Sequence, residues 1–134
     1  MKVYFEDYSE YYLEERKDKG WSEDFYLLYN EKYYRLTIFD RVRLFQDVDG
    51  DIIYVGAPIP MPNLVIVNTI SYEDVRLAIQ KLIESGTIDY FKACETIGNK
   101  IICFASQKQI DTYKSLGFPY WVNKSDLKVF IDTD

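Results

Sequence analysis

Three aspartates, Asp47, Asp49 and Asp51, lie within five positions in the stretch DVDGDIIYVG at 47–56. Carboxylates at alternate positions are typical of an EF-hand calcium loop, but that loop also needs glycine at its sixth position and glutamate at its twelfth. Here the glycine comes fourth and a proline stands twelfth. An Asp-Gly pair favours a two-residue type I′ hairpin turn. The stretch therefore predicts an acidic turn between two antiparallel strands, with a calcium site as the alternative.

The two cysteines, Cys94 and Cys103, flank the segment CETIGNKIIC. A two-residue turn at 98–99 places them opposite each other on neighbouring strands, where a disulfide is sterically conceivable. Two cysteines are too few for a disulfide scaffold, and they lack the Cys-x-x-Cys spacing of zinc sites. In a reducing cytosol we expect two thiols packed in a sheet, with a redox switch as the alternative.

The chain contains no histidine. This excludes the usual general base near neutral pH, the Ser-His and Cys-His nucleophile pairs and imidazole metal sites. The sequence also lacks a glycine-rich phosphate loop and a Gly-x-Ser-x-Gly elbow. We therefore expect no catalytic residues, no metal and no cofactor, while carboxylate, lysine or tyrosine chemistry remains the alternative.

The net charge of −6 is concentrated in the first half of the chain. Residues 1–62 hold 13 acidic and 8 basic side chains, whereas residues 63–134 hold 9 and 8. An acidic surface repels phosphate backbones, so we expect no direct binding to nucleic acid. It suits a basic protein partner, because opposite potentials speed encounter and favour orientation. The same charge also keeps proteins without any partner soluble.

The chain is rich in aromatic residues, with 13 tyrosines and 8 phenylalanines. Many of the tyrosines crowd the N-terminal part, so some are expected at the surface beside acidic residues. Tyrosine is favoured at interfaces because it buries much area at little entropic cost, although strands without a partner also carry half-exposed tyrosines. The expected partner-binding residues are Tyr11, Tyr12, Glu14, Glu15, Asp47, Asp49 and Asp51.

These features together predict a non-enzymatic protein-binding domain that occludes a basic partner surface, as an immunity protein or an inhibitor of a toxin or nuclease does. That analogy is one of charge and size, not of motifs. The alternative is a small-molecule-binding or carboxylate-dependent enzymatic domain. Its pocket would lie near the proline-containing loop at 57–63 and beside Arg35, Arg41 and Arg43, which alternation places on one side of a strand.

The first half of the chain predicts an N-terminal helix followed by an antiparallel β-meander. The helix is capped by Ser9 and ends at Gly20. A hairpin over 24–40 turns at 30–31. Apolar residues then alternate along the next segment and extend the strands to about 56. These apolar positions are Leu36, Ile38, Val42 and Leu44.

The second half predicts the order β-α-β-β-α-β, which is that of ferredoxin-like domains. Its elements are a buried strand over 64–69, a helix capped by Ser71 and ended by Gly86, a hairpin turning at 98–99, a helix over 106–116, and one or two strands within 120–132. This resemblance in element order implies nothing about function.

The length of 134 residues and hydrophobic content of 48% fit one compact α+β domain spanning 1–134. The alternative is a division into two subdomains near 57–63. No apolar run approaches the length of a membrane helix, and the N-terminus does not resemble a signal peptide. We therefore expect a cytoplasmic protein with no membrane partner.

Overall fold

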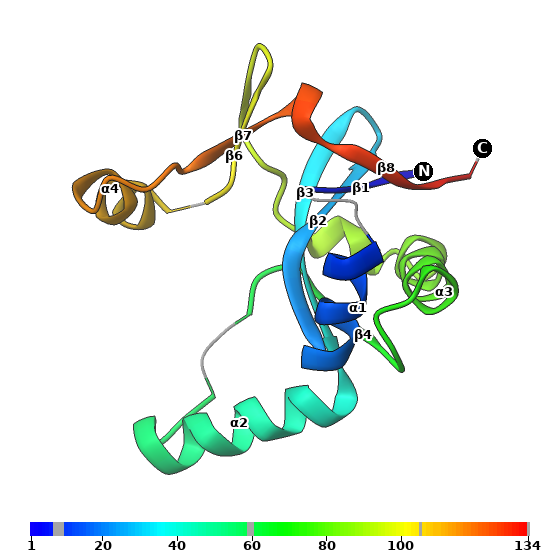
Figure 1. Ribbon diagram of the computed structural model, residues 1–134, viewed down its shortest axis with the longest axis vertical. Coiled ribbons are helices and arrows are strands. Elements are labelled where there is room, and N and C mark those ends of the chain that lie inside the picture. Colours follow the sequence, from blue (N-terminus) through cyan, green and yellow to red (C-terminus); the bar gives the residue numbers. More distant parts are fainter. Residues whose placement is uncertain (7–9, 59–60, 105, 134) are drawn as a thin grey trace.

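A computed structural model describes residues 1–6, 10–58, 61–104 and 106–133. Within these ranges the chain forms four α-helices and two β-sheets (Figure 1). The α+β class predicted from the sequence is confirmed. No helix in the described ranges is long and apolar enough to cross a membrane.

The larger sheet has five strands in the order β4-β3-β2-β1-β8. They are β1 (Lys2–Phe5), β2 (Trp21–Tyr29), β3 (Lys32–Asp40), β4 (Leu64–Val67) and β8 (Lys128–Asp132). The predicted β2–β3 hairpin is confirmed, and Asn30 and Glu31 both adopt the positive φ that a type I′ turn requires. The sequence analysis did not identify β1, which joins the two ends of the chain by pairing with both β2 and β8.

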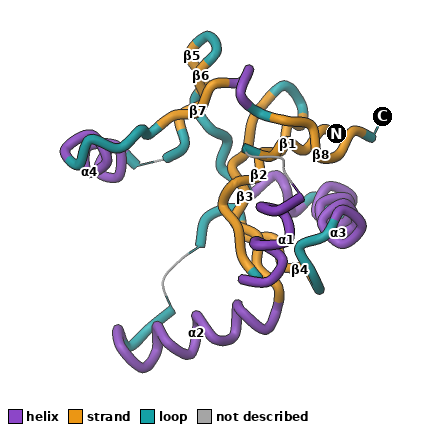
Figure 2. The backbone as a smooth tube through the Cα atoms, viewed as in Figure 1, coloured by secondary structure: helices purple, strands orange, loops and turns teal. Residues whose placement is uncertain are grey.

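The main core lies on one face of this sheet, against α1 (Glu10–Lys19) and α3 (Tyr72–Glu84) (Figure 2). Period-two alternation points Phe5 and Phe25 into it, where their rings stack with centroids 4.6 Å apart. From α3, Val75 and Ile79 are fully buried, and Leu13 of α1 packs against the same cluster. α1 and α3 therefore cover this face of the sheet.

The predicted ends of the helices are mostly confirmed. The hydroxyl of Ser71 accepts a hydrogen bond from the backbone N–H of Asp74 at 3.4 Å and caps α3. Gly86 follows this helix in the left-handed conformation. Ser106 caps α4 (Gln107–Ser115) in the same way. Gly20 ends α1 as predicted, whereas its predicted cap, Ser9, lies outside the described residues.

The smaller sheet consists of β5 (Thr96–Ile97), β6 (Lys100–Ile102) and β7 (Trp121–Asn123). The turn predicted at 98–99 is confirmed, while 87–90 forms a short 3₁₀ helix instead of a strand. Ile101 and Leu127 pack against Tyr26 on the face of the larger sheet opposite the main core. The ferredoxin-like order is wrong, because β4 and β8 pair with β3 and β1 of the first half and leave the other strands in a sheet of their own.

The segment predicted to contain the third strand and the acidic turn is a helix, α2 (Arg41–Val55). Asp40 caps its start by accepting a hydrogen bond from the Arg43 N–H at 2.8 Å, and Gly56 ends it in the left-handed conformation. The alternation of Val42 and Leu44 was misleading because a short apolar run fits either period, and a glycine inside a helix costs only about 1 kcal/mol. The hairpin prediction is therefore wrong, and so is the alternative of a calcium loop.

Two helices project from the body. α2 and α4 extend toward the left of the view, α2 below and α4 above (Figure 1). Neither helix contains a buried residue. Helices of this length are only marginally stable in water without tertiary packing, and α2 and α4 receive little such packing from the body.

Candidate functional site

A cavity of about 480 Å³ lies where α1, the larger sheet and β7 meet, and we call it the acidic cavity. Its charged lining consists of three carboxyl groups and one cation. These are Glu6, Asp24, Asp126 and Arg16. Tyr12 and Trp121 supply aromatic walls. A cavity with more carboxyl groups than cations is suited to a positively charged group.

Two neighbouring strands position the first two carboxyl groups. Glu6 directly follows β1, and its N–H donates to the Asp24 carbonyl at 3.0 Å, which continues the β1–β2 pairing. The β2–β3 register shifts between Ser22 and Phe25, and such irregularities redirect side chains. At this point the Ser22 hydroxyl accepts the N–H of Asp24 at 3.1 Å. The local backbone therefore holds Asp24 beside Glu6.

The cation in the cavity already has a carboxylate partner. Arg16 of α1 lies with Nε 2.6 Å from Asp24 Oδ2, and both side chains are about three-quarters buried, at 24% and 27% exposure. A charge-assisted hydrogen bond this short fixes α1 to the sheet. Because Asp24 neutralises Arg16, the remaining charge in the cavity comes from Glu6 and Asp126.

The Glu6 carboxyl titrates near neutral pH. Burial and then the negative charge of Asp24 raise its pKa from 4.5 to about 7, although Arg35 and Arg16 act in the opposite direction. Loss of solvation and a like charge both disfavour the ionised form. Near pH 7 the cavity therefore holds one half-protonated carboxyl group beside an ion-paired carboxylate.

Glu6→Gln is expected to remove a pH dependence of stability. The pKa of Glu6 is higher in the folded protein, so its contribution is fully present below pH 4.5 and is lost as pH rises through about 7. After allowance for solvent screening, the wild-type free energy of unfolding should fall by about 1–2 kcal/mol more than that of the variant between pH 5 and 8. Urea denaturation at both pH values measures this, and an equal fall in the two proteins would contradict the assignment.

A second cavity, of about 570 Å³, contains both cysteines and is called the thiol cavity. Both are free thiols, and Tyr26 Oη lies 3.3 Å from Cys103 Sγ. Burial is the main effect that raises the pKa of each thiol above its usual value. Both are therefore neutral near pH 7, which is unlike a reactive thiolate. The two thiols are free as predicted, but they do not lie within the sheet, because Cys94 precedes β5 and Cys103 follows β6.

The proline-containing loop borders two cavities, and Arg35 and Arg43 line one cavity each. Arg35 lies in the thiol cavity near Pro62, pairs with Glu23 at 3.4 Å and stacks 5.3 Å from the centre of the Phe104 ring. Arg43 lines a separate cavity of about 320 Å³ beneath α2. The predicted sharing of one strand face by Arg35, Arg41 and Arg43 is wrong, because only Arg35 is on β3.

Asn63 ties the loop before β4 to the segment that leads into the thiol cavity. Its Nδ2 donates to the carbonyls of Arg35 and Lys92, both at 2.9 Å, and its Oδ1 accepts the Lys92 N–H at 2.8 Å. Asn63→Ala should lower the free energy of unfolding by about 2 kcal/mol, since it removes three hydrogen bonds at a positive φ that asparagine tolerates better than alanine. Thermal denaturation measures this. The exposed Asn68→Ala is the control, and equal losses would contradict the expectation.

Of the predicted binding residues of α1, Tyr12 lines the acidic cavity, whereas Glu14 lies two positions further along the helix and faces another side. Tyr11 is 73% exposed, and its ring meets that of Tyr12 edge to face with centroids 5.5 Å apart. Glu14 is exposed. Glu15 is instead engaged within the helix, with Lys19 at 2.7 Å and Arg16 at 3.6 Å. Tyr11, Tyr12 and Glu14 thus belong to the exposed surface of α1, whereas Glu15 mainly stabilises the helix.

The structure does not bring the predicted aspartates to that surface. Asp47 pairs with Arg43 at 2.8 Å, and Asp47 and Asp51 line the cavity beneath α2. Asp49 is exposed. Arg43 Nη1 also donates to the Lys19 carbonyl at 3.3 Å. α2 therefore joins the carboxyl end of α1, opposite the end that carries Tyr11 and Tyr12.

The sequence analysis missed Glu6, Asp24, Trp121 and Asp126 as site residues. The signal for Glu6 was the alternation of VYFE over 3–6, which places valine and phenylalanine on one face of a strand and the glutamate on the other. Nothing in the sequence shows that Trp121 and Asp126, more than 90 residues later, lie beside it. That juxtaposition depends on how the smaller sheet packs on the larger one.

No protein-family model, curated protein or solved structure matches this chain. Within the described ranges, no group of three or more histidine, cysteine or acidic side chains is arranged to hold a metal ion. The function is therefore inferred from the geometry of the chain's own residues.

Proposed function

We propose that this chain is a non-enzymatic protein-binding domain that occludes a basic surface of its partner. A lysine or arginine of the partner enters the acidic cavity, and Tyr11, Tyr12 and Glu14 contact the surface around it. The observation that carries the proposal is the unequal charge of this cavity, where three carboxyl groups surround one arginine that is already ion-paired. An inhibitor or immunity protein would act in this way, without chemistry.

The electrostatics of the cavity support a cationic side chain. Asp126 is exposed at the cavity mouth, and Glu6 gains negative charge as pH rises through about 7. A guanidinium group offers five donors to such oxygens, and it also stacks on aromatic rings. The Trp121 ring already holds Lys100 Nζ 4.5 Å from its centre, which supports its role as a cation-binding wall.

Affinity capture tests this function. Wild-type protein, Asp126→Lys and Glu84→Lys are each used to retain proteins from the source cell's lysate, at low and then at high salt. Glu84 lies exposed on α3, so its reversal makes the same change in net charge outside the cavity. The proposal requires a basic protein that the wild type and Glu84→Lys retain at low salt and Asp126→Lys does not. Identical retention by all three proteins would overturn it.

One observation favours a second function for the same cavity. A carboxyl group with a pKa of about 7 beside an ion-paired carboxylate is a pairing that enzymes use for general acid–base catalysis. In that case the ligand would be a small molecule, with Glu6 as the acid and Asp24 as the base. A metabolite screen by thermal shift would identify such a ligand. Consumption of that ligand by wild type but not by Glu6→Gln would then favour this second function over the first.

A further inference from the structure

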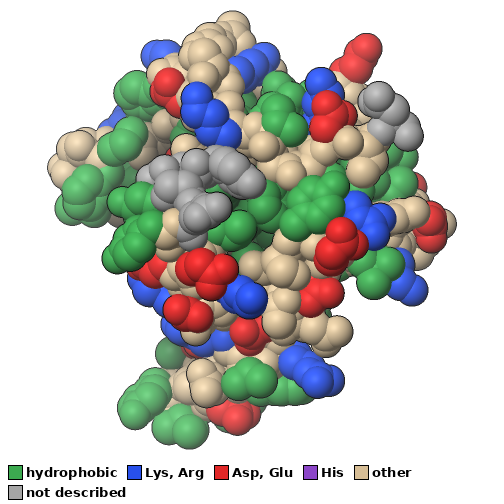
Figure 3. Space-filling model, turned by 45° about the vertical axis from the view of Figure 1, so that its right-hand side comes forward, with side chains coloured by type: hydrophobic (Ala, Val, Ile, Leu, Met, Phe, Trp, Pro, Cys, Tyr) green, Lys and Arg blue, Asp and Glu red, His purple; other side chains and the backbone are tan. Residues whose placement is uncertain are grey.

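The helix α2 turns three of its charged side chains toward the protein and exposes large apolar side chains to solvent. Arg43, Asp47 and Asp51 line the cavity between α2 and the sheet, together with Trp21 and Phe39. Six large apolar side chains of α2 are 49% to 87% exposed, beside the exposed polar residues Arg41, Gln46 and Asp49. The six apolar residues are Val42, Phe45, Ile52, Ile53, Tyr54 and Val55. Green side chains gather accordingly at the lower end of the molecule (Figure 3), where Figure 1 places α2.

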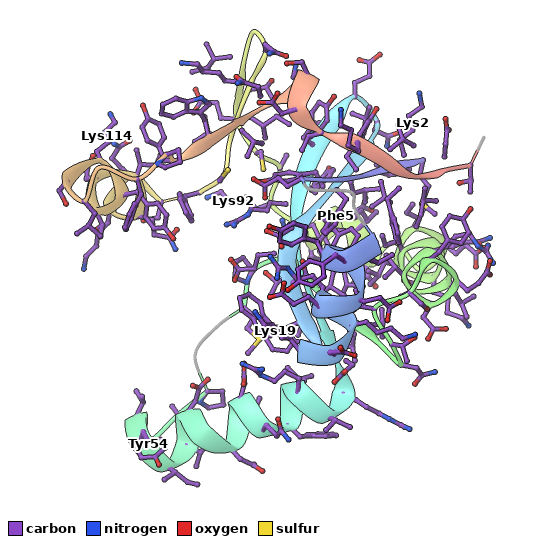
Figure 4. The ribbon with its side chains drawn as sticks, viewed as in Figure 1. Lys2, Phe5, Lys19, Tyr54, Lys92 and Lys114 are labelled. Atoms are coloured by element: carbon purple, nitrogen blue, oxygen red, sulfur yellow. The ribbon has the colours of Figure 1, made fainter. Side chains whose placement is uncertain are left out.

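Packing within its own chain contributes little to the stability of this helix. None of its residues is buried, and its far end, marked by Tyr54, extends away from the body (Figure 4). Five β-branched residues and Gly50 lower its intrinsic helix propensity. Large apolar side chains gathered on one exposed helix indicate an interaction surface. A partner that covers the face would supply the packing that α2 lacks.

The apolar residues follow the spacing of helix–helix packing. Phe45, Val48, Ile52 and Val55 recur at intervals of three, four and three, and Arg41 precedes them by four. This is the spacing of the seam positions of a coiled coil, which a second helix fills by knobs-into-holes packing. The partner expected at this face is therefore a helix of similar length.

The charges of α2 complement those of a second copy of itself. Arg41 in the first turn and Asp49 near the middle are exposed, whereas Arg43, Asp47 and Asp51 line the cavity toward the sheet. In an antiparallel pair about a twofold axis, Arg41 of each copy lies opposite the Ile52 turn of the other, beside Asp49. The antiparallel orientation also opposes the two helix dipoles. An anionic membrane surface, in contrast, would be repelled by these aspartates and by the net charge of −6.

We infer that the chain forms a homodimer through antiparallel pairing of its two α2 helices. The dimer buries Phe45, Val48 and Ile52 of this seam and leaves the acidic cavity of each copy open, since that cavity lies at α1 and β7. This inference is independent of the proposed function. A single pair of short helices is a small interface, so the dimer is expected to dissociate on dilution.

A charge exchange tests the pairing and its orientation. Sedimentation velocity is measured over a concentration series that spans roughly three decades around the micromolar range. Wild type should shift from monomer to dimer. Arg41→Asp and Asp49→Arg should each remain monomeric, because each places like charges opposite each other. Their equimolar mixture should dimerise again, because both cross-pairs then become attractive.

Matched variants of the apolar face complete the test. Phe45→Gln removes a ring from the seam, while Tyr54→Gln removes a ring from a position outside the seam spacing. Only the first should abolish the dimer, and circular dichroism confirms that both proteins are folded. A monomeric wild type at every concentration would overturn the inference. So would a mixture of the charge variants that stays monomeric, or equal effects of Phe45→Gln and Tyr54→Gln.

Discussion

Gly20→Ala is expected to lower the free energy of unfolding by about 2–4 kcal/mol. Gly20 adopts a φ of +77°, and a Cβ atom there would lie 2.5 Å from Asp40 Oδ2 and 2.9 Å from Arg43 Cβ. Its carbonyl accepts the Asp40 N–H at 2.8 Å, so the residue joins the end of α1 to the start of α2. Any side chain would therefore force apart the cap of one helix and the end of another.

Gly117→Ala is the matched control for this prediction. Gly117 has a φ of +73°, but a Cβ atom there meets nothing within 4 Å. Gly117→Ala should lower the free energy of unfolding only by the cost of placing alanine at a positive φ, on the order of 1 kcal/mol. Chemical denaturation of both variants measures the difference. If both substitutions lowered the free energy of unfolding equally, the close contacts at Gly20 would not explain the effect of Gly20→Ala.

Local signals predicted much of the secondary structure. Ser71 and Ser106 were identified as caps because a short hydroxyl side chain can satisfy the open N–H groups of a first turn. The turn at 98–99 was predicted from a Gly-Asn pair, which hairpin turns accept, and the turn at 30–31 from its place between two strand-like runs. Each of these features depends on residues within four positions of one another.

The predictions were wrong where local signals were ambiguous, and they were incomplete where segments far apart in the sequence determine the structure. Residues 41–55 carry both an alternating and a helical apolar pattern, and the Asp-Gly pair was interpreted as a turn although it lies inside α2. Recognising Asp40 and Gly56 as caps would have indicated the helix. The acidic cavity could not have been predicted, because Glu6 and Asp126 meet only once β8 returns to pair with β1.

Asp126→Lys is expected to weaken binding of a basic probe at least about tenfold. The substitution replaces an attractive charge at the mouth of the acidic cavity with a repulsive one. Asp126 is exposed and its oxygen accepts only a surface hydrogen bond, from Asn123 at 3.2 Å, so the fold should be little affected. A tri-arginine peptide is the probe, and the NMR shift of the Trp121 indole N–H reports its dissociation constant.

Glu84→Lys makes the same change in net charge away from the cavity and is the control. It should weaken binding less than about threefold, as expected for a long-range charge effect that salt screens. Equal effects of the two substitutions would mean that the peptide responds to the overall charge of the protein and not to the acidic cavity.

The central claim is that the acidic cavity receives a cationic side chain, and a site-resolved titration tests it most directly. Nitrogen-15-labelled wild-type protein is titrated with tri-arginine at pH 8 and low salt, and then with added salt. The expected result is a saturable shift of the Trp121 indole and of the backbone amides of Glu6 and Asn123, which salt reverses. Shifts absent from these residues, or spread evenly over all acidic surfaces, would contradict the claim.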